Sequence, residues 1–182
     1  MKTSYKGKLL ISKPSISGDI FSRAVVLIIE HNEEGAFGLI LNKRNPALSS
    51  AATGLLHTSI DVYEGGPVEI GKIFFIVKGV PHRDSHLALN ENFYLTQEME
   101  TIIDDILRNQ LSTDDIKVFT GYSGWESNQL DNEVANNFWN IIDDPSFDYT
   151  AHEDDTLWKH LMQNLGGENL LWANAPEDIT MN

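Results

Sequence analysis

The 182-residue sequence contains no cysteine. This absence excludes disulfide bonds, thiolate nucleophiles, cysteine-ligated zinc and iron–sulfur clusters, so any catalysis would use oxygen or imidazole groups. Basic residues are also scarce, because 13 lysines and arginines stand against 27 aspartates and glutamates, a formal net charge of −14. A charge of this sign repels phosphate backbones and anionic membrane surfaces. We therefore expect no nucleic-acid partner and no membrane partner.

Long apolar runs are absent as well. The longest uninterrupted run, 24–29, is far shorter than the ~20 residues of a membrane-spanning helix. The run near the start, 9–11, is shorter than the ~7 to 15 apolar residues of a signal peptide. A cytoplasmic location is the resulting expectation. Because no linker or repeat divides the chain, we expect a single domain over residues 1–182.

Apolar patterning predicts strands first and then a mixture of strands and helices. The runs 24–31 and 36–42 flank the segment NEEG and predict a β-hairpin whose arms are covered on both faces. Further strands are expected at 8–12, 60–66, 72–78, 116–120 and 139–143, and helices at 96–107, 130–138 and 156–165. Because strands and helices do not alternate regularly, the pattern favours an α+β fold built round the hairpin.

The other segments are predicted to be connections. We expect one helical turn at 48–56 inside a small-residue connection, and a loop or short helical turn at 15–22. A long polar loop at 79–92 is typical of functional or mobile segments. The acidic stretch 144–155 is predicted to be a loop, and roughly the last dozen residues a loose tail.

The segment GYSGW, residues 121–125, resembles a nucleophile elbow, in which a serine sits on a sharp turn between a strand and a helix. The elbow pattern G-x-S-x-G requires a small residue at its fifth position, which Trp125 occupies here. We therefore interpret the segment as a turn permitted by its glycines, a structural corner whose tryptophan covers the core.

Histidines and acidic residues give further candidates. Glu30 and His31 are adjacent, but neighbours in a strand point to opposite faces, so a shared acid–base site would need a bulge. His82 and His86 have metal-protease spacing without the glutamate that follows the first histidine in those enzymes. The run 152–155 lacks the spacing of a calcium loop, and GGPV at 65–68 lacks the rest of a phosphate loop. We predict neither a metal nor a cofactor.

Three separated motifs together resemble the AlgH/YqgE family of bacterial proteins: EHNEEGAFGLILNKR at 30–44, YEGGPV at 63–68, and GYSGWESNQLDNEVANNFW at 121–139. The resemblance covers nearly the whole chain in order. It implies a single α+β domain whose mixed β-sheet is folded into an open pseudo-barrel with flanking helices. It implies no activity, since the family is mostly uncharacterised and is named for a proposed regulatory role in alginate synthesis. Family members commonly have alanine at the position of Ser123, which argues against a serine nucleophile.

The motif positions supply the candidate site. They are expected either to line a binding cleft or to cross-link the hairpin end to the segment before the following helix. The candidate cluster is Glu30, His31, Asn42, Gly65, Gly66, Tyr122, Gly124, Trp125, Gln129 and Glu133.

Three functions remain open at this point. The preferred one is a non-enzymatic cytosolic regulatory or interaction protein that binds a protein partner or a small molecule, because glycines, aromatic residues and amides suit binding. One alternative is a hydrolase or metal-assisted enzyme that uses Glu30, His31 and Glu133. The other, a transcriptional regulator, follows the family name alone, and the net charge of −14 opposes it.

Overall fold

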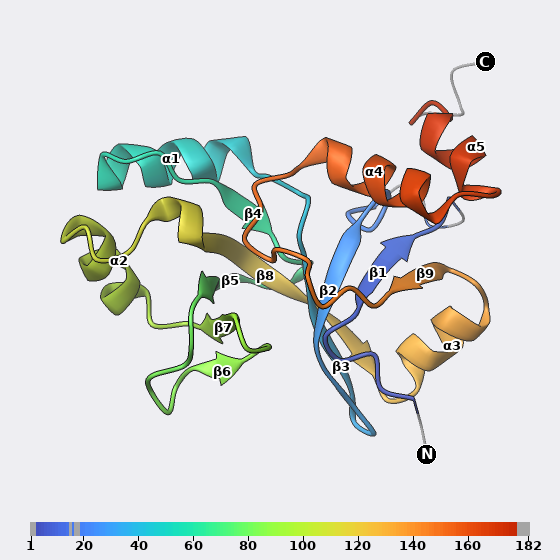
Figure 1. Cartoon of the computed structure of the whole chain (residues 1–182), viewed down its shortest axis with the longest axis horizontal. Helices are drawn as coiled ribbons and strands as arrows, with labels where there is room; N and C mark the ends of the chain where they lie inside the picture. Colours follow the sequence, from blue (N-terminus) through green and yellow to red (C-terminus); the bar gives the residue numbers. More distant parts are fainter. Residues whose placement is uncertain (1–2, 15, 17–18, 178–182) are drawn as a thin grey trace.

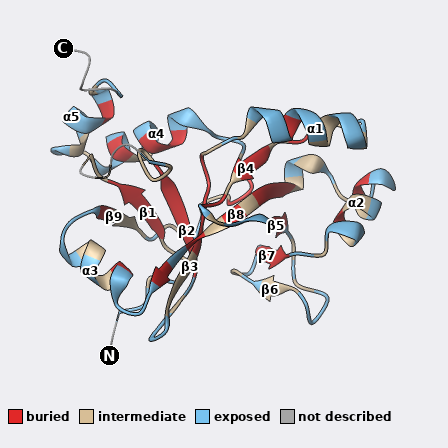
Figure 2. Ribbon diagram, turned by 180° about the vertical axis from the view of Figure 1, so that it is seen from behind, coloured by how far each residue is buried: buried red, intermediate tan, exposed pale blue. Residues whose placement is uncertain are grey.

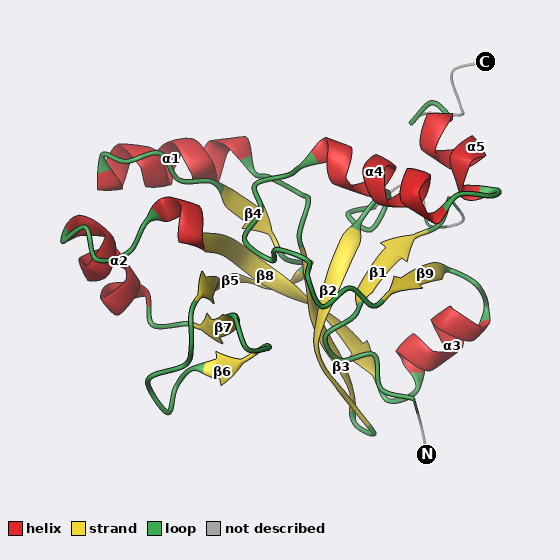
Figure 3. Cartoon of the chain, viewed as in Figure 1, coloured by secondary structure: helices red, strands yellow, loops and turns green. Residues whose placement is uncertain are grey.

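One curled, mixed β-sheet forms the centre of the molecule (Figure 1). The structure is a computed structural model and describes residues 3–14, 16 and 19–177. Nine strands in these residues form the sheet in the order β6-β7-β5-β8-β3-β2-β1-β9, with β4 paired to β8 off this path. The β4–β8 pair is parallel and the other pairs are antiparallel. Helices flank this open half-barrel (Figure 3), which confirms the α+β fold class.

The strands and helices have the following bounds. The strands are β1 Leu9–Ser12, β2 Val25–Asn32, β3 Gly35–Ile40, β4 Val62–Glu64, β5 Val68–Lys78, β6 Leu87–Ala88, β7 Phe93–Thr96, β8 Ile116–Glu126 and β9 Trp139–Ile142. The helices are α1 Pro46–Leu56, α2 Met99–Leu107, α3 Gln129–Ala135, α4 Asp155–Leu165 and α5 Asn169–Asn174, with a 3-10 turn at Thr113–Asp115.

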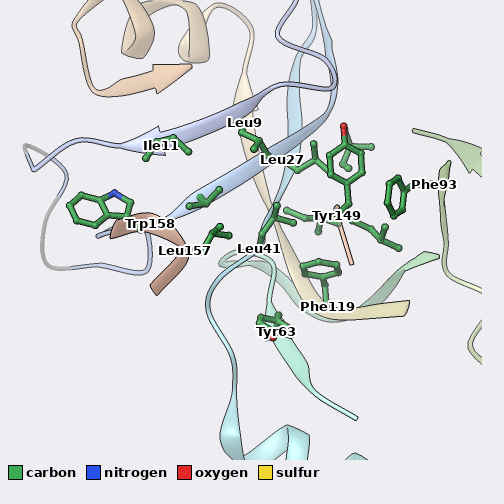
Figure 4. Close-up of a cluster of buried hydrophobic side chains, with 14 of the residues drawn as sticks. Leu9, Ile11, Leu27, Leu41, Tyr63, Phe93, Phe119, Tyr149, Leu157 and Trp158 are labelled. Carbon is green, nitrogen blue, oxygen red and sulfur yellow. The ribbon is translucent and has the colours of Figure 1, made fainter. Parts of the chain in front are cut away.

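Residues 25–29 and 38–40 of the β2–β3 hairpin are covered on both faces, as the continuous apolar runs predict, while its turn end is partly exposed. Leu27 faces a core cluster that contains Leu157 and Trp158 of α4, whereas Val26 faces a second cluster under α3. Figure 4 shows the first cluster, with Trp158 and Leu157 beside Ile11 of β1. Figure 2 shows that burial is concentrated in these central strands, while the outer faces of the helices are exposed.

The motif 121–125 lies inside strand β8, so the prediction of a turn there is wrong. Residues 116–120 of β8 pair with β4 and β5, and residues 123–126 pair with β3. Gly121, with φ of 67°, marks the bend between these two halves. Partners on both sides keep the chain extended, and the glycine lets it change direction within the strand. Strand β8 therefore joins the two halves of the sheet.

Helices α1 and α2 cover the β4–β5–β8 half of the sheet. Helix α1 has three turns where the sequence predicts one, because its small residues give little periodicity. The side chain of Asn45 caps it by accepting a hydrogen bond from Leu48 N, with Pro46 at the first position. Helix α2 begins at Met99, three residues later than predicted, because Thr96 ends strand β7.

Several other boundaries also differ from the sequence prediction. Strand β6 lies within the predicted loop 79–92, and β5 begins at Val68 instead of 72. Phe138 lies beyond α3 and is exposed. Helix α5 occupies the start of the predicted tail, whose residues 178–182 lie outside the described part of the chain, as do residues 15, 17 and 18 of the predicted loop 15–22.

Candidate functional site

A cleft of ≈ 820 Å³ lies between the β2–β3 hairpin, the β6–β7 segment and the start of α2. Figure 1 shows β6, β7 and the β2–β3 hairpin, the elements that supply these lining residues, in the lower part of the molecule. Its volume is in the range of small-molecule sites. The aromatic floor of the cleft consists of Phe37, Phe74 and Tyr122, and its acidic rim consists of Glu30, Glu69 and Glu98.

The aromatic floor is formed by three strands that meet at this point. The ring centroids of Phe37 and Tyr122 are 5.0 Å apart, and those of Phe37 and Phe74 are 5.5 Å apart. These separations are typical of stabilising aromatic pairs. Phe74 is buried beneath the other two, which remain partly exposed to the cleft. Since β3, β5 and β8 are neighbours in the sheet, the floor is held by the backbone ladder.

The rim carries more negative than positive charge. Lys72 is the one basic residue among the described residues that line the cleft, and its ammonium lies 2.9 Å from the carboxylate of Glu69. Hydrogen bonds from Lys72 and Tyr122 lower the pKa of Glu69. Desolvation and the hydrogen bond to Glu69 raise the pKa of Tyr122, so the phenol stays neutral at pH 7.

Glu98 anchors the loop that closes one end of the cleft. Ser85 Oγ donates to one carboxylate oxygen at 2.7 Å, and His86 Nε2 lies 3.4 Å from the other. The hydrogen bond from Ser85 lowers the pKa of Glu98, so this carboxylate is ionised at pH 7. The ring of His86 stacks on Tyr94 with centroids 4.4 Å apart, and its Nδ1 is buried without a hydrogen-bond partner.

Two of the ten candidate residues, Glu30 and Tyr122, line this cleft. His31 lies on the other face of the hairpin, where Nδ1 accepts a hydrogen bond from Tyr5 N and Nε2 is 3.6 Å from Asp131. The adjacent pair Glu30–His31 therefore does not share a site, even though a register shift between Ile28 and Glu30 bends the strand.

Glu133, Trp125 and Gln129 form a structural network instead. The Glu133 carboxylate accepts hydrogen bonds from Trp125 Nε1 at 2.9 Å, Trp139 Nε1 at 2.8 Å and Gln129 Nε2 at 3.0 Å. These bonds tie α3 to β8 and β9. The structure thus does not bring together Glu30, His31 and Glu133, the three residues of the hydrolase alternative.

The paired glycines permit a close crossing of two segments. A Cβ on Gly65 would lie 2.5 Å from Gly121 O, and a Cβ on Gly121 would lie 2.5 Å from Gly66 O. A Cβ on Gly66 would overlap the carbonyl of Tyr122. The 65–66 segment can therefore pass directly over β8 and hold Tyr122 in place. By contrast, a Cβ on Gly124 would meet only ordinary contacts, the nearest at 3.5 Å.

Asn42 and Ser123 are buried, and their side chains form hydrogen bonds with backbone groups. Asn42 Oδ1 accepts from Val25 N, and its Nδ2 donates to Arg23 O, both at 2.9 Å. Ser123 Oγ donates to Gly65 O at 3.0 Å, and the residue is fully buried. A serine without solvent access or a basic partner is not an available nucleophile.

Most of the cleft-lining residues carry no functional signal in the sequence. Phe37 lies inside a recognised motif, but its apolar side chain suggested only core. Glu69 and Phe74 come from strand β5, whereas Glu98 precedes α2 and Glu30 lies in β2, so no local pattern joins them. The length and polarity of the predicted loop 79–92 were the one signal of a functional segment. Ser85 and Leu87 of this segment line the cleft. Within the described residues, no group of three or more acidic or histidine side chains could hold a metal.

Comparison with known proteins gives a family but no activity. The family model described as AlgH-like matches residues 9–170. The chain belongs to the AlgH-like family. UPF0301 proteins of Cytophaga hutchinsonii and Bacteroides thetaiotaomicron are 32% and 31% identical to it, over 97% of this chain and 98% and 91% of theirs. The resemblance inferred from the three motifs is therefore confirmed.

Two solved structures show the same fold. The solution structure of the AlgH protein from Pseudomonas aeruginosa matches with a TM-score of 0.73 and 26% identity, over 97% of each chain. A crystal structure of a Corynebacterium diphtheriae protein matches with a TM-score of 0.72 and 20% identity, over 96% of this chain and 94% of that one. No helix in the part of the chain that the structure describes is long and apolar enough to span a membrane.

Proposed function

We propose that this AlgH-like protein is a cytoplasmic regulatory binding protein whose cleft takes a small organic cation with an apolar body. The observation that carries the proposal is the acidic rim of Glu30, Glu69 and Glu98 above the aromatic floor of Phe37, Phe74 and Tyr122. Covering the aromatic floor with an apolar body gains roughly 25 cal/mol for each Å² of apolar surface removed from water, and a cation beside the carboxylates of the rim gains a favourable charge pair. The apolar body of the ligand would cover the floor and the cation would reach the rim.

The polar groups of the cleft support binding better than catalysis. The arrangement closest to a catalytic one is Ser85, Glu98 and His86. In a serine hydrolase the histidine lies between the serine and the acid. Here the carboxylate of Glu98 lies between Ser85 and His86 instead, so the histidine is not placed to take the serine proton. This geometry holds the loop in position and leaves the serine unactivated.

The chain's charge also supports a cationic ligand. Its net charge of −14 attracts cations over a long range and repels anions such as nucleotides and nucleic acids. This field gives the transcriptional-regulator alternative no support. The proposed regulation would act through the bound ligand and a partner protein.

The experiment is a calorimetric and thermal-shift comparison of two probes of matched shape. Phenethylamine carries a cation on an aromatic body, and 3-phenylpropionate carries an anion on the same body. We expect phenethylamine to bind with one site and 3-phenylpropionate not to bind. A ligand at ~100 times its Kd adds about 2.7 kcal/mol and would raise the melting temperature by roughly 5 to 10 °C.

Three variants locate the binding. Glu30→Gln removes one rim charge, and Tyr122→Leu removes part of the floor while keeping an apolar side chain; each should weaken phenethylamine binding several-fold. Glu34→Gln changes an exposed acid of the hairpin turn that does not line the cleft, and should leave the affinity unchanged. Equal binding of the anion, no binding of the cation, or equal effects of Glu30→Gln and Glu34→Gln would each overturn the proposal.

A further inference from the structure

A second concave surface lies on the opposite side of the β5–β8 pair from the cleft's floor, between helices α1 and α2. This groove has a volume of ≈ 300 Å³, and every residue that lines it has an apolar side chain except Thr120. Its base consists of strand residues such as Val62, Phe75 and Val118, and its walls consist of residues from the two helices. Figure 2 shows α1 and α2 next to each other at the end of the molecule that carries β4 and β8, with exposed outer surfaces.

The walls of the groove expose large apolar side chains to solvent. On α1, Leu48 is 41% and Leu55 is 81% exposed, and these residues are seven positions apart, about two helical turns. On α2, Met99 is 43% exposed. Exposed apolar side chains grouped round a depression, unlike single scattered ones, mark interaction surfaces. A groove between two helices is a shape that takes the apolar face of a third helix.

The charges beside the groove indicate the chemistry of its occupant. Helix α1 has no charged residue, whereas α2 carries Glu100, Asp104 and Asp105. Arg108 at the end of α2 is paired with Asp104 at 3.0 Å. None of these acids lines the groove itself, so the neutral wall is helix α1 and the acidic wall is helix α2, whose acids lie outside its apolar lining. A partner with an apolar stripe and lysines or arginines along one edge would complement both walls.

A second copy of this chain fits the groove poorly. The apolar side of α4, including Leu157 and Met162, is already buried in the chain's own core. Helix α5 exposes Leu171 and Trp172 but has only six residues and no basic residue. A copy with a net charge of −14 would also bring further negative charge towards the acidic wall.

We propose that the groove between α1 and α2 is a docking site for a basic amphipathic helix of a partner protein. Apolar side chains at positions i, i+3 or i+4, and i+7 of that helix would insert between Leu48 and Leu55 on one wall and Met99 on the other. Its basic residues would lie along α2. This surface is separate from the cation cleft, so the two proposals can fail independently.

The test uses synthetic labelled peptides of about 18 residues, long enough to form helix. One contains leucines in a helical stripe with lysines elsewhere, a second replaces every lysine by glutamate, and a third has the lysine peptide's composition without the stripe. We expect the striped lysine peptide to bind the full chain in a one-to-one, saturable manner by fluorescence anisotropy. The other two peptides should bind at least about tenfold more weakly, a difference of about 1.4 kcal/mol.

Leu55→Gln is the decisive variant, because a side chain that is 81% exposed can be changed without disturbing the core. The variant should bind the striped lysine peptide with an affinity at least about tenfold lower, the effect typical of an anchor residue of an interface. The matched control is Leu171→Gln on α5, where a leucine of 74% exposure lies outside the groove. Glu30→Gln in the cleft should also have no effect on this peptide.

Several outcomes would overturn the docking proposal. Equal binding of the striped and unstriped lysine peptides would show attraction to net charge alone, and preference for the glutamate peptide would contradict the acidic wall. A dimer that light scattering detects and Leu55→Gln dissociates would assign the groove to a second copy. Binding of a fluorescent fatty acid that Leu55→Gln abolishes, with no peptide bound, would assign it to a lipid chain.

Discussion

The indole nitrogen of Trp125 donates a hydrogen bond of 2.9 Å to the carboxylate of Glu133. Trp139 donates to the same oxygen at 2.8 Å, so two tryptophans from strands β8 and β9 converge on one acid of helix α3. Both tryptophans are buried, at 7% and 5% exposure. Trp125 and Trp139, two residues of the family motif 121–139, therefore hold helix α3 against the sheet.

Glu133→Leu should destabilise the fold. It keeps a similar volume but leaves two buried indole N–H groups and the Gln129 amide without their acceptor, at about 1 to 3 kcal/mol for each buried donor. We expect a loss of about 2 to 4 kcal/mol of unfolding free energy, measured by urea titration. Glu91→Leu, in an exposed loop, is the control. If Glu133→Leu lowered the unfolding free energy no more than Glu91→Leu does, the hydrogen-bond network of Glu133 would contribute little to stability.

Gly66→Ala should also be strongly destabilising. Gly66 has φ of 156°, and a Cβ there would overlap the backbone of Tyr122. Backbone strain and overpacking together should lower the free energy of unfolding by about 2 to 4 kcal/mol, measured by urea titration. Gly54→Ala should instead raise the free energy of unfolding by about 0.5 to 1 kcal/mol. Gly54 lies in helix α1 with open space around it, and alanine favours a helix more than glycine does. If both variants had the same sign, the steric account of the crossing would be wrong.

Lys117 should make stability depend on pH. Its ammonium donates to Ala151 O at 2.6 Å, lies 4.1 Å from the centroid of the Tyr63 ring, and is 1% exposed. Burial lowers the pKa of Lys117 from 10.5 to about 7, with nearby carboxylates, Glu153 first among them, acting in the opposite direction. The unfolded chain therefore binds one more proton than the folded chain between these two values. Over this window Lys117 makes stability rise with pH.

The measurement compares the wild type with Lys117→Met at several pH values. The stability of the wild type relative to the variant should increase by roughly 1 kcal/mol per pH unit between about pH 7 and pH 10. Other titrating groups are common to both chains and cancel in the difference. A difference that stays flat over this range would mean that Lys117 keeps an ordinary pKa in the folded protein.

Lys72→Gln should strengthen the binding of phenethylamine. Lys72 pairs with Glu69 at the rim, and its removal frees a carboxylate for the ligand while removing a like charge. Because both side chains are 49% exposed, the gain should be modest, about two- to fivefold in Kd by calorimetry. Lys159→Gln on the exposed side of α4 is the control. Weaker binding by Lys72→Gln would place the ligand elsewhere or reverse its charge preference.

Local patterns in the sequence determined much of the fold. The continuous apolar runs at 24–31 and 36–42 predicted a buried hairpin, and residues 25–29 of β2 and 38–40 of β3 are buried, whereas the hairpin end is partly exposed. The amphipathic spacing at 96–107 predicted α2, and three motifs in register predicted the family. These features rest on periodicity and on contacts between residues near in sequence, which the chain displays directly.

Only the tertiary structure decided what the motif residues do. The segment 121–125 has the small and aromatic residues of a turn, yet pairing with β3 and β5 on either side holds it as strand. The curl of the sheet brought Glu30, Glu69 and Glu98 to one rim. Strand pairing between distant segments sets these positions. A single sequence contains no local signal for it, so the cleft became visible only in the folded chain.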